Sequence, residues 1–255
     1  MNGLAMAASN AMLTAAARAD IALRGVAPFQ EDGTWFDNRY IQAEFWPKAL
    51  DTLNMTLLSA LFTVLLGLPL GLALVASAPK GLAPNRTLNQ VLGAIVNVGR
   101  SIPFIILMVM VVPITRAITG TTITWYSAVV PLTIAAVPFF ARLVETSLSS
   151  VGEGKVEAAL MMGASRLRVL WDVLVRESLA SLIQNVTVVI VTLIGYTAMA
   201  GAIGSGGLGQ LAINQGYNRN MYDVMYIAVG GILVMVMVFQ FVGDMLSRLV
   251  DHSRR

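Results

Sequence analysis

The sequence contains no cysteine and a single histidine, and each of these absences excludes chemistry. Without cysteine the chain has no disulfide, thiolate zinc site, iron–sulfur cluster or cysteine nucleophile. The one histidine, His252, stands among the last residues of the sequence, which removes histidine-based metal sites and most general-base catalysis. We therefore expect no metal site and no catalytic residue.

Charge is also scarce. Charged residues make up 12% of the 255 residues, apolar residues make up 56%, and the mean hydropathy is +0.73. Soluble domains carry about 25% charged residues, so too few charges are present to coat a water-facing surface. The composition therefore indicates an integral membrane protein. The small net charge of +3 gives no reason to expect nucleic acid as a partner.

Long apolar runs alternate with short polar breaks after Asp51, and a membrane-spanning helix needs about 20 largely apolar residues. We predict five spans and hence an all-α fold. Their ranges are 54–78, 91–113, 124–146, 178–200 and 222–247. Prolines fall inside them, among them Pro69, Pro103, Pro131 and Pro138. Membrane helices tolerate proline where neighbours satisfy the freed carbonyl.

The second span contains Arg100. Its Val, Ile, Leu and Phe residues contribute about −3 to −7 kcal/mol to insertion, against about +2.5 to +3.5 kcal/mol for a central arginine. Insertion is therefore favoured, and Arg100 is expected to face protein or water rather than lipid. Two interpretations remain open: Arg100 and Ser101 line a route through the membrane, or Arg100 forms a structural pair with Glu145.

Lys and Arg concentrate on one side of the predicted spans, in the breaks at 79–90 and 147–177 and after residue 247, although Arg39 and Lys48 oppose this trend. The positive-inside rule then predicts a cytoplasmic C-terminus and, with five spans, an N-terminus outside. We divide the chain into an extracytoplasmic or interfacial extension, a transmembrane domain and a cytoplasmic tail. Their ranges are 1–50, 51–250 and 251–255.

The stretch GSGGLG at 204–209 matches G-x-G-x-x-G, the fingerprint of a dinucleotide-binding turn. That motif requires a preceding strand within a βαβ unit, whereas here the glycines follow the apolar run IVTLIGYTAMA. The sequence favours the alternative, in which glycines permit a tight turn and close packing, as in a re-entrant loop or a helix contact. Such a loop persists at membrane depth only where it is buried in protein or lines a water-filled path.

The stretch VEAALMMGASRLRVLWDVLVRESL at 156–179 is too charged to span and has apolar residues at helical spacing. Within it, Glu157, Ala158, Ala159 and Gly163 form the pattern E-A-A-x-x-x-G. One interpretation is an amphipathic helix on the inner membrane surface, with Arg166 and Arg168 near anionic lipids. Its position in the long cytoplasmic connection, about 150–177, favours a coupling role instead.

This segment resembles the EAA loop of bacterial ATP-binding-cassette importer permeases, in which short coupling helices dock into a cleft on a separate ATPase. The likeness covers about 53–249, and five stretches are similar to methionine-importing members of that family. They are GRSIPFIIL (99–107), VPLTIAAVPFFARLVE (130–145), EAALMMGAS (157–165), GYTAMAGAIGSGGLGQ (195–210) and FQFVGD (239–244). At 173–176 the sequence Val-Leu-Val-Arg replaces the family's I-x-L-P, so a gentler bend into the fourth span is expected.

The resemblance implies the type I importer fold, in which a homodimer of five-span subunits in the bacterial inner membrane works with two cytoplasmic ATPase copies. A substrate-binding lipoprotein or periplasmic protein would deliver methionine, in its L- and also its D-form. The chain lacks G-x-x-x-x-G-K-[ST], so it is expected to be no enzyme and to need no cofactor, ATP being bound by the partner. The alternatives are another small amino acid as cargo, or a secondary transporter, for which no internal repeat is found.

The resemblance also implies roles for individual residues. It assigns contact with the ATPase to Glu157, Ala158, Ala159, Gly163 and Ala164. The small side chains would permit close approach, and Glu157 would place a charge near a helix N-terminus. Met199 matches a position that closes the outer gate, the alternatives being a lipid-facing or a core methionine. Five glycines would shape the outer end of the route near the dimer axis: Gly201, Gly204, Gly206, Gly207 and Gly209.

Overall fold

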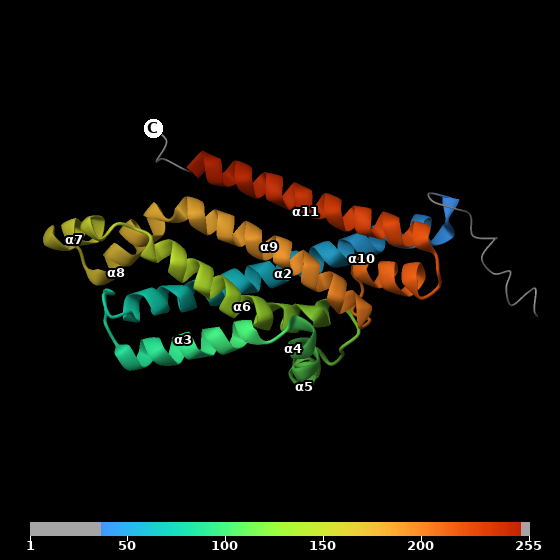
Figure 1. The fold of residues 1–255 in the computed structure, drawn as a ribbon, viewed down its shortest axis with the longest axis horizontal. Helices are drawn as coiled ribbons and strands as arrows, with labels where there is room; N and C mark the ends of the chain where they lie inside the picture. Colours follow the sequence, from blue (N-terminus) through green and yellow to red (C-terminus); the bar gives the residue numbers. More distant parts are fainter. Residues whose placement is uncertain (1–36, 251–255) are drawn as a thin grey trace, which may run out of the picture.

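The structure is a computed structural model that describes residues 37–250. Within this range the chain is helical and contains no strand, which confirms the all-α expectation. Four helices are long and apolar enough to cross a membrane, and they correspond to four of the five predicted spans. They are α2 (Arg39–Ser77), α6 (Trp125–Ser149), α9 (Leu179–Ala202) and α11 (Tyr222–Val250), and all run along the long axis of the molecule (Figure 1).

Helix α2 begins at Arg39, well before the predicted start at 54, because Asn38 caps it. The Asn38 side chain accepts a hydrogen bond from the Tyr40 amide at 3.0 Å. The predicted boundary at residue 50 therefore falls inside a continuous helix. Most of the predicted N-terminal extension, residues 1–36, and the predicted tail, residues 251–255, lie outside the described residues.

The second predicted span, 91–113, is wrong as a single helix. It divides into α3 (Arg86–Ser101) and α4 (Phe104–Met110), which bend by 104° at the break between them, and α5 (Val112–Thr119) follows. Pro103 occupies the break and precedes α4 instead of lying inside a span. Proline lacks an amide hydrogen and disfavours helical geometry in the residue before it, so a helix ends here despite the apolar sequence.

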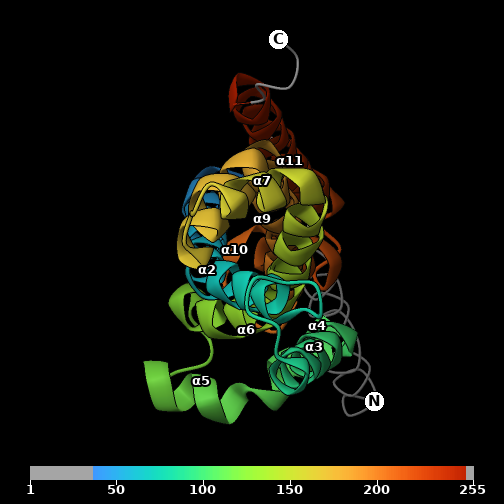
Figure 2. The ribbon, with the colours of Figure 1, turned by 90° about the vertical axis from the view of Figure 1, so that its left-hand side faces the viewer.

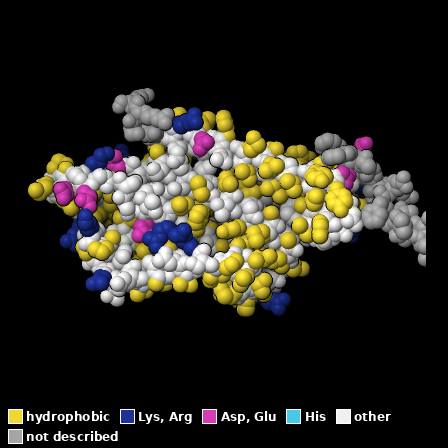
Figure 3. Space-filling view, in the orientation of Figure 1, with side chains coloured by type: hydrophobic (Ala, Val, Ile, Leu, Met, Phe, Trp, Pro, Cys, Tyr) yellow, Lys and Arg dark blue, Asp and Glu magenta, His cyan; other side chains and the backbone are white. Residues whose placement is uncertain are grey.

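Helices α2, α6 and α9 form the centre of the molecule, with α11 on one side and α3 to α5 on the other (Figure 2). Their buried side chains, among them Met55, Leu132, Phe140 and Leu193, make the main core. A Cβ on Gly71 would lie 2.6 Å from Cβ of Val144, so glycine allows α2 and α6 to approach closely. Exposed apolar side chains cover much of the outside (Figure 3), as a lipid-facing surface requires.

The connections gather at two opposite ends (Figure 1). The α7 end holds the α2–α3 connection, the C-terminal part of α11, and three short elements: α7 (Glu153–Met161), α8 (Arg166–Arg168) and the π-helix η2 (Val169–Val175). The opposite half of the molecule, which we call the α10 end, holds the start of α2, α10 (Gly207–Gln210), the π-helix η3 (Leu211–Tyr217) and, nearer the middle, α5. The candidate site residues lie mainly at these two ends.

Candidate functional site

The glycine-rich turn connects α9 to α10 through backbone conformations that side chains disfavour. Gly204, Gly206 and Gly207 have φ values of 103°, 93° and 78°, a region open mainly to glycine. Residues 205–209 are buried. The tight turn that the sequence predicts is therefore present.

Two further glycines of this segment serve close packing. A Cβ on Gly201 would lie 2.4 Å from the Gln210 amide nitrogen, and one on Gly209 would lie 2.5 Å from Cα of Ala198. The backbone of α10 therefore packs directly against the last turn of α9. The chain folds back in this way before η3 and α11 begin, which agrees with the close packing that the glycines predict.

A dinucleotide has no place at this turn. The residue range 37–250 contains no strand to precede it. The Leu208 amide, which a phosphate would need, donates a hydrogen bond to Oγ1 of Thr52 at 2.8 Å. A carboxylate oxygen of Asp51 lies 3.3 Å from the place of a Cβ on Gly206, and its negative charge would repel a phosphate. The glycines pack α9, α10 and α2 together.

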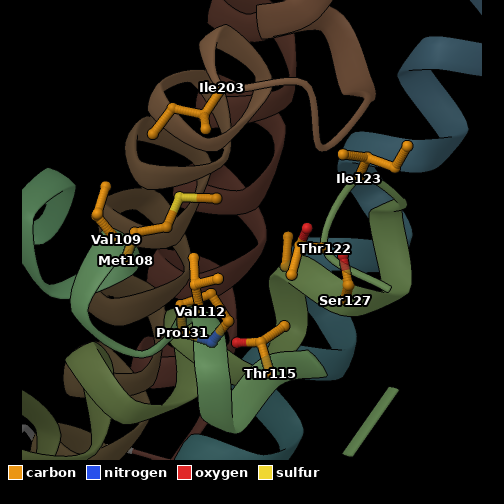
Figure 4. Close-up of a pocket in the computed structure, with 10 residues that line it drawn as sticks. Met108, Val109, Val112, Thr115, Thr122, Ile123, Ser127, Pro131 and Ile203 are labelled. Carbon is orange, nitrogen blue, oxygen red and sulfur yellow. The ribbon is translucent and has the colours of Figure 1, made fainter. Parts of the chain in front are cut away.

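Met199 precedes the turn on α9 and is 37% exposed, so it is not core filler within this chain. One helical turn earlier, Tyr196 stacks on Phe104 of α4, with ring centroids 4.4 Å apart and planes at 2°. A small cavity of about 80 Å³ lies nearby, between α4, α5, the start of α6 and Ile203 (Figure 4). It is lined by apolar groups and hydroxyls without a charged residue, so it suits a few water molecules rather than a charged solute.

The predicted amphipathic helix over 156–179 is broken in the middle. Helix α7 ends at Met161, and helical structure resumes at Arg166. The Gly163 amide donates to the Leu160 carbonyl at 2.9 Å and the Ala164 amide donates to the Ala159 carbonyl at 3.1 Å, the two bonds of a Schellman helix end. Gly163 has φ 85°, and a Cβ there would meet nothing within 4 Å. Within this chain Gly163 therefore serves the helix end rather than close packing.

The other motif residues lie on α7 or directly after it. Glu157 and Ala158 are exposed, Ala159 is buried, and Ala164 is half-buried. Glu153 is the acidic residue of the first turn of α7, so the predicted location of Glu157 near a helix N-terminus is wrong. The helix begins earlier than the motif because Gly152 provides the N-cap.

Two adjacent methionines, which the sequence analysis did not single out, stand out at the end of α7. Met161 is 90% exposed and Met162 is 83% exposed. Methionine side chains are flexible and polarisable and form adaptable contact surfaces. Their only sequence signal was a location inside the stretch EAALMMGAS. Figure 3 shows apolar side chains at the tip of the α7 end, beyond most of the charged ones.

Ion pairs attach α7 to its surroundings on both sides. Lys80 of the α2–α3 connection binds Glu153 at 3.2 Å, and Lys155 binds Glu177, just before α9, at 2.5 Å. A cavity of about 790 Å³ lies between α7, η2 and the ends of α2 and α6. Ion pairs therefore attach the first turn of α7 to its neighbours, and the cavity separates α7 from the helical body.

Arg100 does not form the predicted pair with Glu145. Glu145 instead binds Arg142 at 2.6 Å, and Arg142 also donates to Oδ1 of Asn97 on α3 at 2.7 Å. Arg100 and Ser101 are exposed at the C-terminal end of α3. Since arginine avoids lipid, Arg100 is still expected to face water or protein, and its place on a route stays a prediction.

Comparisons with known proteins agree on one family. Residues 67–255 match the family described as binding-protein-dependent transport system inner membrane component. A probable D-methionine transport system permease, MetI of Vibrio cholerae, is 46% identical over 201 residues, which are 79% of this chain and 89% of that protein. The methionine import system permease MetP of Bacillus subtilis is 44% identical over 167 residues, 66% of this chain and 75% of that protein.

A solved structure agrees with these sequence relatives. It shows inward-facing conformations of the MetNI methionine ABC transporter and superposes with a TM-score of 0.80 at 40% identity. The superposition covers 81% of this chain and 96% of the matched chain. The fold described above, with its broken second span, is therefore similar to that of a transporter subunit.

Proposed function

We propose, from the premise that this chain belongs to the family of binding-protein-dependent transport system inner membrane components, that it is the permease subunit of an ATP-driven methionine importer. The observation that carries the proposal is that the relatives and the solved transporter, all named for methionine, match most of this chain. Two copies of the chain form the pore, and a separate ATPase and a substrate-binding protein complete the importer.

The distribution of charge supports the orientation that we propose. At the α7 end stand Lys80, Arg86, Lys155, Arg166, Arg168, Arg176 and Arg248, whereas the α10 end has Arg39, Lys48, Arg116 and Arg219. By the positive-inside rule the α7 end faces the cytoplasm. The described chain starts at one end and finishes at the other (Figure 1), so the N-terminal side lies outside and the C-terminal side inside.

In this proposal the ATPase docks on α7, where Glu157 offers a charge and Met161 and Met162 offer an adaptable apolar surface. The chain itself hydrolyses no ATP and binds no cofactor. Closure of the ATPase pair displaces α7. The ion pair between Lys155 and Glu177 then passes this displacement to the start of α9.

Helix α9 links the docking end to the outer end of the proposed route. Because it is one continuous helix from Leu179 to Ala202, a displacement at its start also moves Met199 near its end. The backbone contact between Gly209 and Ala198 ties α10 to the same movement. Met199 and its counterpart in the second copy form the outer gate by an isologous contact, and the glycine turn supports the gate.

Reconstitution tests the function. The chain, its ATPase and its binding protein are incorporated into vesicles, and uptake of labelled L-methionine is measured with and without ATP, with D-methionine and other amino acids as competitors. We expect uptake to require ATP and all three proteins, and methionine to compete best. Uptake without the ATPase would refute the ATP-driven mechanism, and preferred uptake of another amino acid would refute methionine as the cargo.

A further inference from the structure

A polar cavity of about 200 Å³ lies at the α10 end, between the start of α2 and η3. It is lined by Glu44, Lys48, Gln210, Leu211, Asn214 and Gln215, so that all lining side chains but one are polar. Pockets for drug-sized ligands measure about 300–1,000 Å³, and this smaller volume suits a small solute. We call it the α2–η3 cavity.

The cavity presents two opposite charges that do not neutralise each other. Glu44 and Lys48 are one helical turn apart on α2, yet no ion pair within residues 37–250 involves either of them. Nζ of Lys48 instead donates a hydrogen bond to Oε1 of Gln210 at 2.7 Å. Both charged side chains are half-buried. A solute in the cavity therefore finds an ammonium and a carboxylate that are each available for a charge-assisted hydrogen bond.

A buried acceptor beside these charges lacks a partner. Oε1 of Gln215 is buried and accepts no hydrogen bond from the described residues. Buried polar atoms are nearly always satisfied in folded proteins, and each exception calls for an explanation. The neighbouring Asn214 amide adds a donor and an acceptor to the same wall. A bound N–H donor would satisfy the Gln215 oxygen.

We propose that the α2–η3 cavity binds the zwitterionic head group of a free amino acid. Lys48 receives the α-carboxylate, while Glu44 and Oε1 of Gln215 receive the α-ammonium. Leu211 is the one apolar side chain in the lining, so the cavity selects for the charged head group and leaves the choice of side chain to the binding protein. This inference rests on the proposed function, because that function supplies the amino acid and places the α10 end outside.

Direct binding tests the cavity without transport. The permease–ATPase complex in lipid nanodiscs, without the binding protein, is titrated with three ligands and followed by saturation-transfer NMR. The ligands are L-methionine, its methyl ester, which lacks the carboxylate, and N-acetyl-L-methionine, which lacks the ammonium. We expect L-methionine to bind best. Any methionine that binds to the ATPase cancels in the comparison of permease variants.

Variants of Lys48 and Glu44 test which group of the ligand each charge binds. Lys48→Gln is expected to weaken L-methionine binding about ten-fold, the effect of one lost hydrogen bond to a charged group, and to abolish discrimination against the methyl ester. Glu44→Gln is expected to do the same for the N-acetyl form. Lys48→Arg, which keeps the charge, is expected to retain binding. Two controls that neutralise exposed charges at the same end, Asp37→Asn and Arg116→Gln, are expected to bind like the wild type.

Two results would overturn the inference. One is that Lys48→Gln and Glu44→Gln bind all three ligands as the wild type does. The other is that ligand binding is unchanged while the loaded binding protein no longer stimulates ATP hydrolysis, which would identify the cavity as a docking surface for that protein. Uptake of labelled methionine by the wild-type complex is measured in parallel, and its failure would count against the proposed function.

Discussion

Replacement of Gly163 by alanine tests the helix end that we assign to the coupling segment. The φ of 85° lies in the left-handed region, which costs a residue with a Cβ about 1–2 kcal/mol. A Cβ at residue 163 would meet nothing within 4 Å, so neither a clash nor a new packing contact changes this cost. The native end of α7 should therefore be disfavoured about 5–30-fold in Gly163→Ala.

Two further variants separate backbone conformation from side-chain size. Gly163→Asn is expected to perturb the helix end less, since asparagine adopts left-handed geometry more readily than alanine. Gly154→Ala introduces the same methyl group within α7, also into open space. Because Gly154 lies inside a right-handed helix, that variant is expected to stabilise α7 by up to about 0.5–1 kcal/mol.

The assay is hydrogen exchange of the amides of residues 163 and 164 in the reconstituted complex, since these amides donate to the Leu160 and Ala159 carbonyls. Co-purified ATPase is measured alongside. We expect exchange about 5–30-fold faster in Gly163→Ala, a smaller change in Gly163→Asn, and a parallel loss of bound ATPase. Wild-type exchange in Gly163→Ala, or equal effects of alanine and asparagine, would refute the reasoning.

Three further substitutions test other parts of the proposal. Glu157→Lys is expected to reduce co-purified ATPase while membrane insertion stays normal, and wild-type amounts of ATPase would argue against docking at this residue. Met199→Ala is expected to raise basal ATP hydrolysis or make vesicles leaky, and tight vesicles with normal basal hydrolysis would remove Met199 from the gate. Gly209→Ala places a methyl group 2.5 Å from the Ala198 backbone, and such overpacking costs about 1–3 kcal/mol or more. Its yield of folded protein is expected to fall, whereas Gly195→Ala, which meets nothing within 4 Å, is expected to match the wild type.

The spans were predictable because membrane insertion depends on apolar length, which can be counted along the sequence. The corner between α3 and α4 was missed because that count averages over a window, whereas Pro103 acts on its immediate neighbours. The partner of Glu145 was also misassigned. Arg142 lies three residues away on the same helix, where side chains are neighbours, so the signal was present in the spacing.

The packing of the glycine turn and the α2–η3 cavity could not be predicted from the sequence. The glycine pattern predicts a turn, but its close contact with α2 depends on how distant helices pack. The hydrogen bond between Lys48 and Gln210 joins residues 162 positions apart. No local pattern predicts such a contact. Gly163 is an intermediate case, since a glycine after a helix is typical of a Schellman end and only the observed φ distinguishes this role from close packing.

The shortness of α3 has a consequence for the lipid around it. Its 16 residues, at about 1.5 Å each, rise roughly 24 Å, less than the ~30 Å thickness of the hydrocarbon layer. The chain then bends by 104° at the break beside Pro103 and continues in α4 and α5. A helix shorter than the hydrocarbon layer is accommodated by local thinning of the bilayer, by snorkelling of flanking side chains or by association with other helices. Arg100, exposed at the end of α3, is placed to reach the water that a thinner bilayer would admit. We therefore expect the acyl-chain length of the host membrane to act on the permease at this corner.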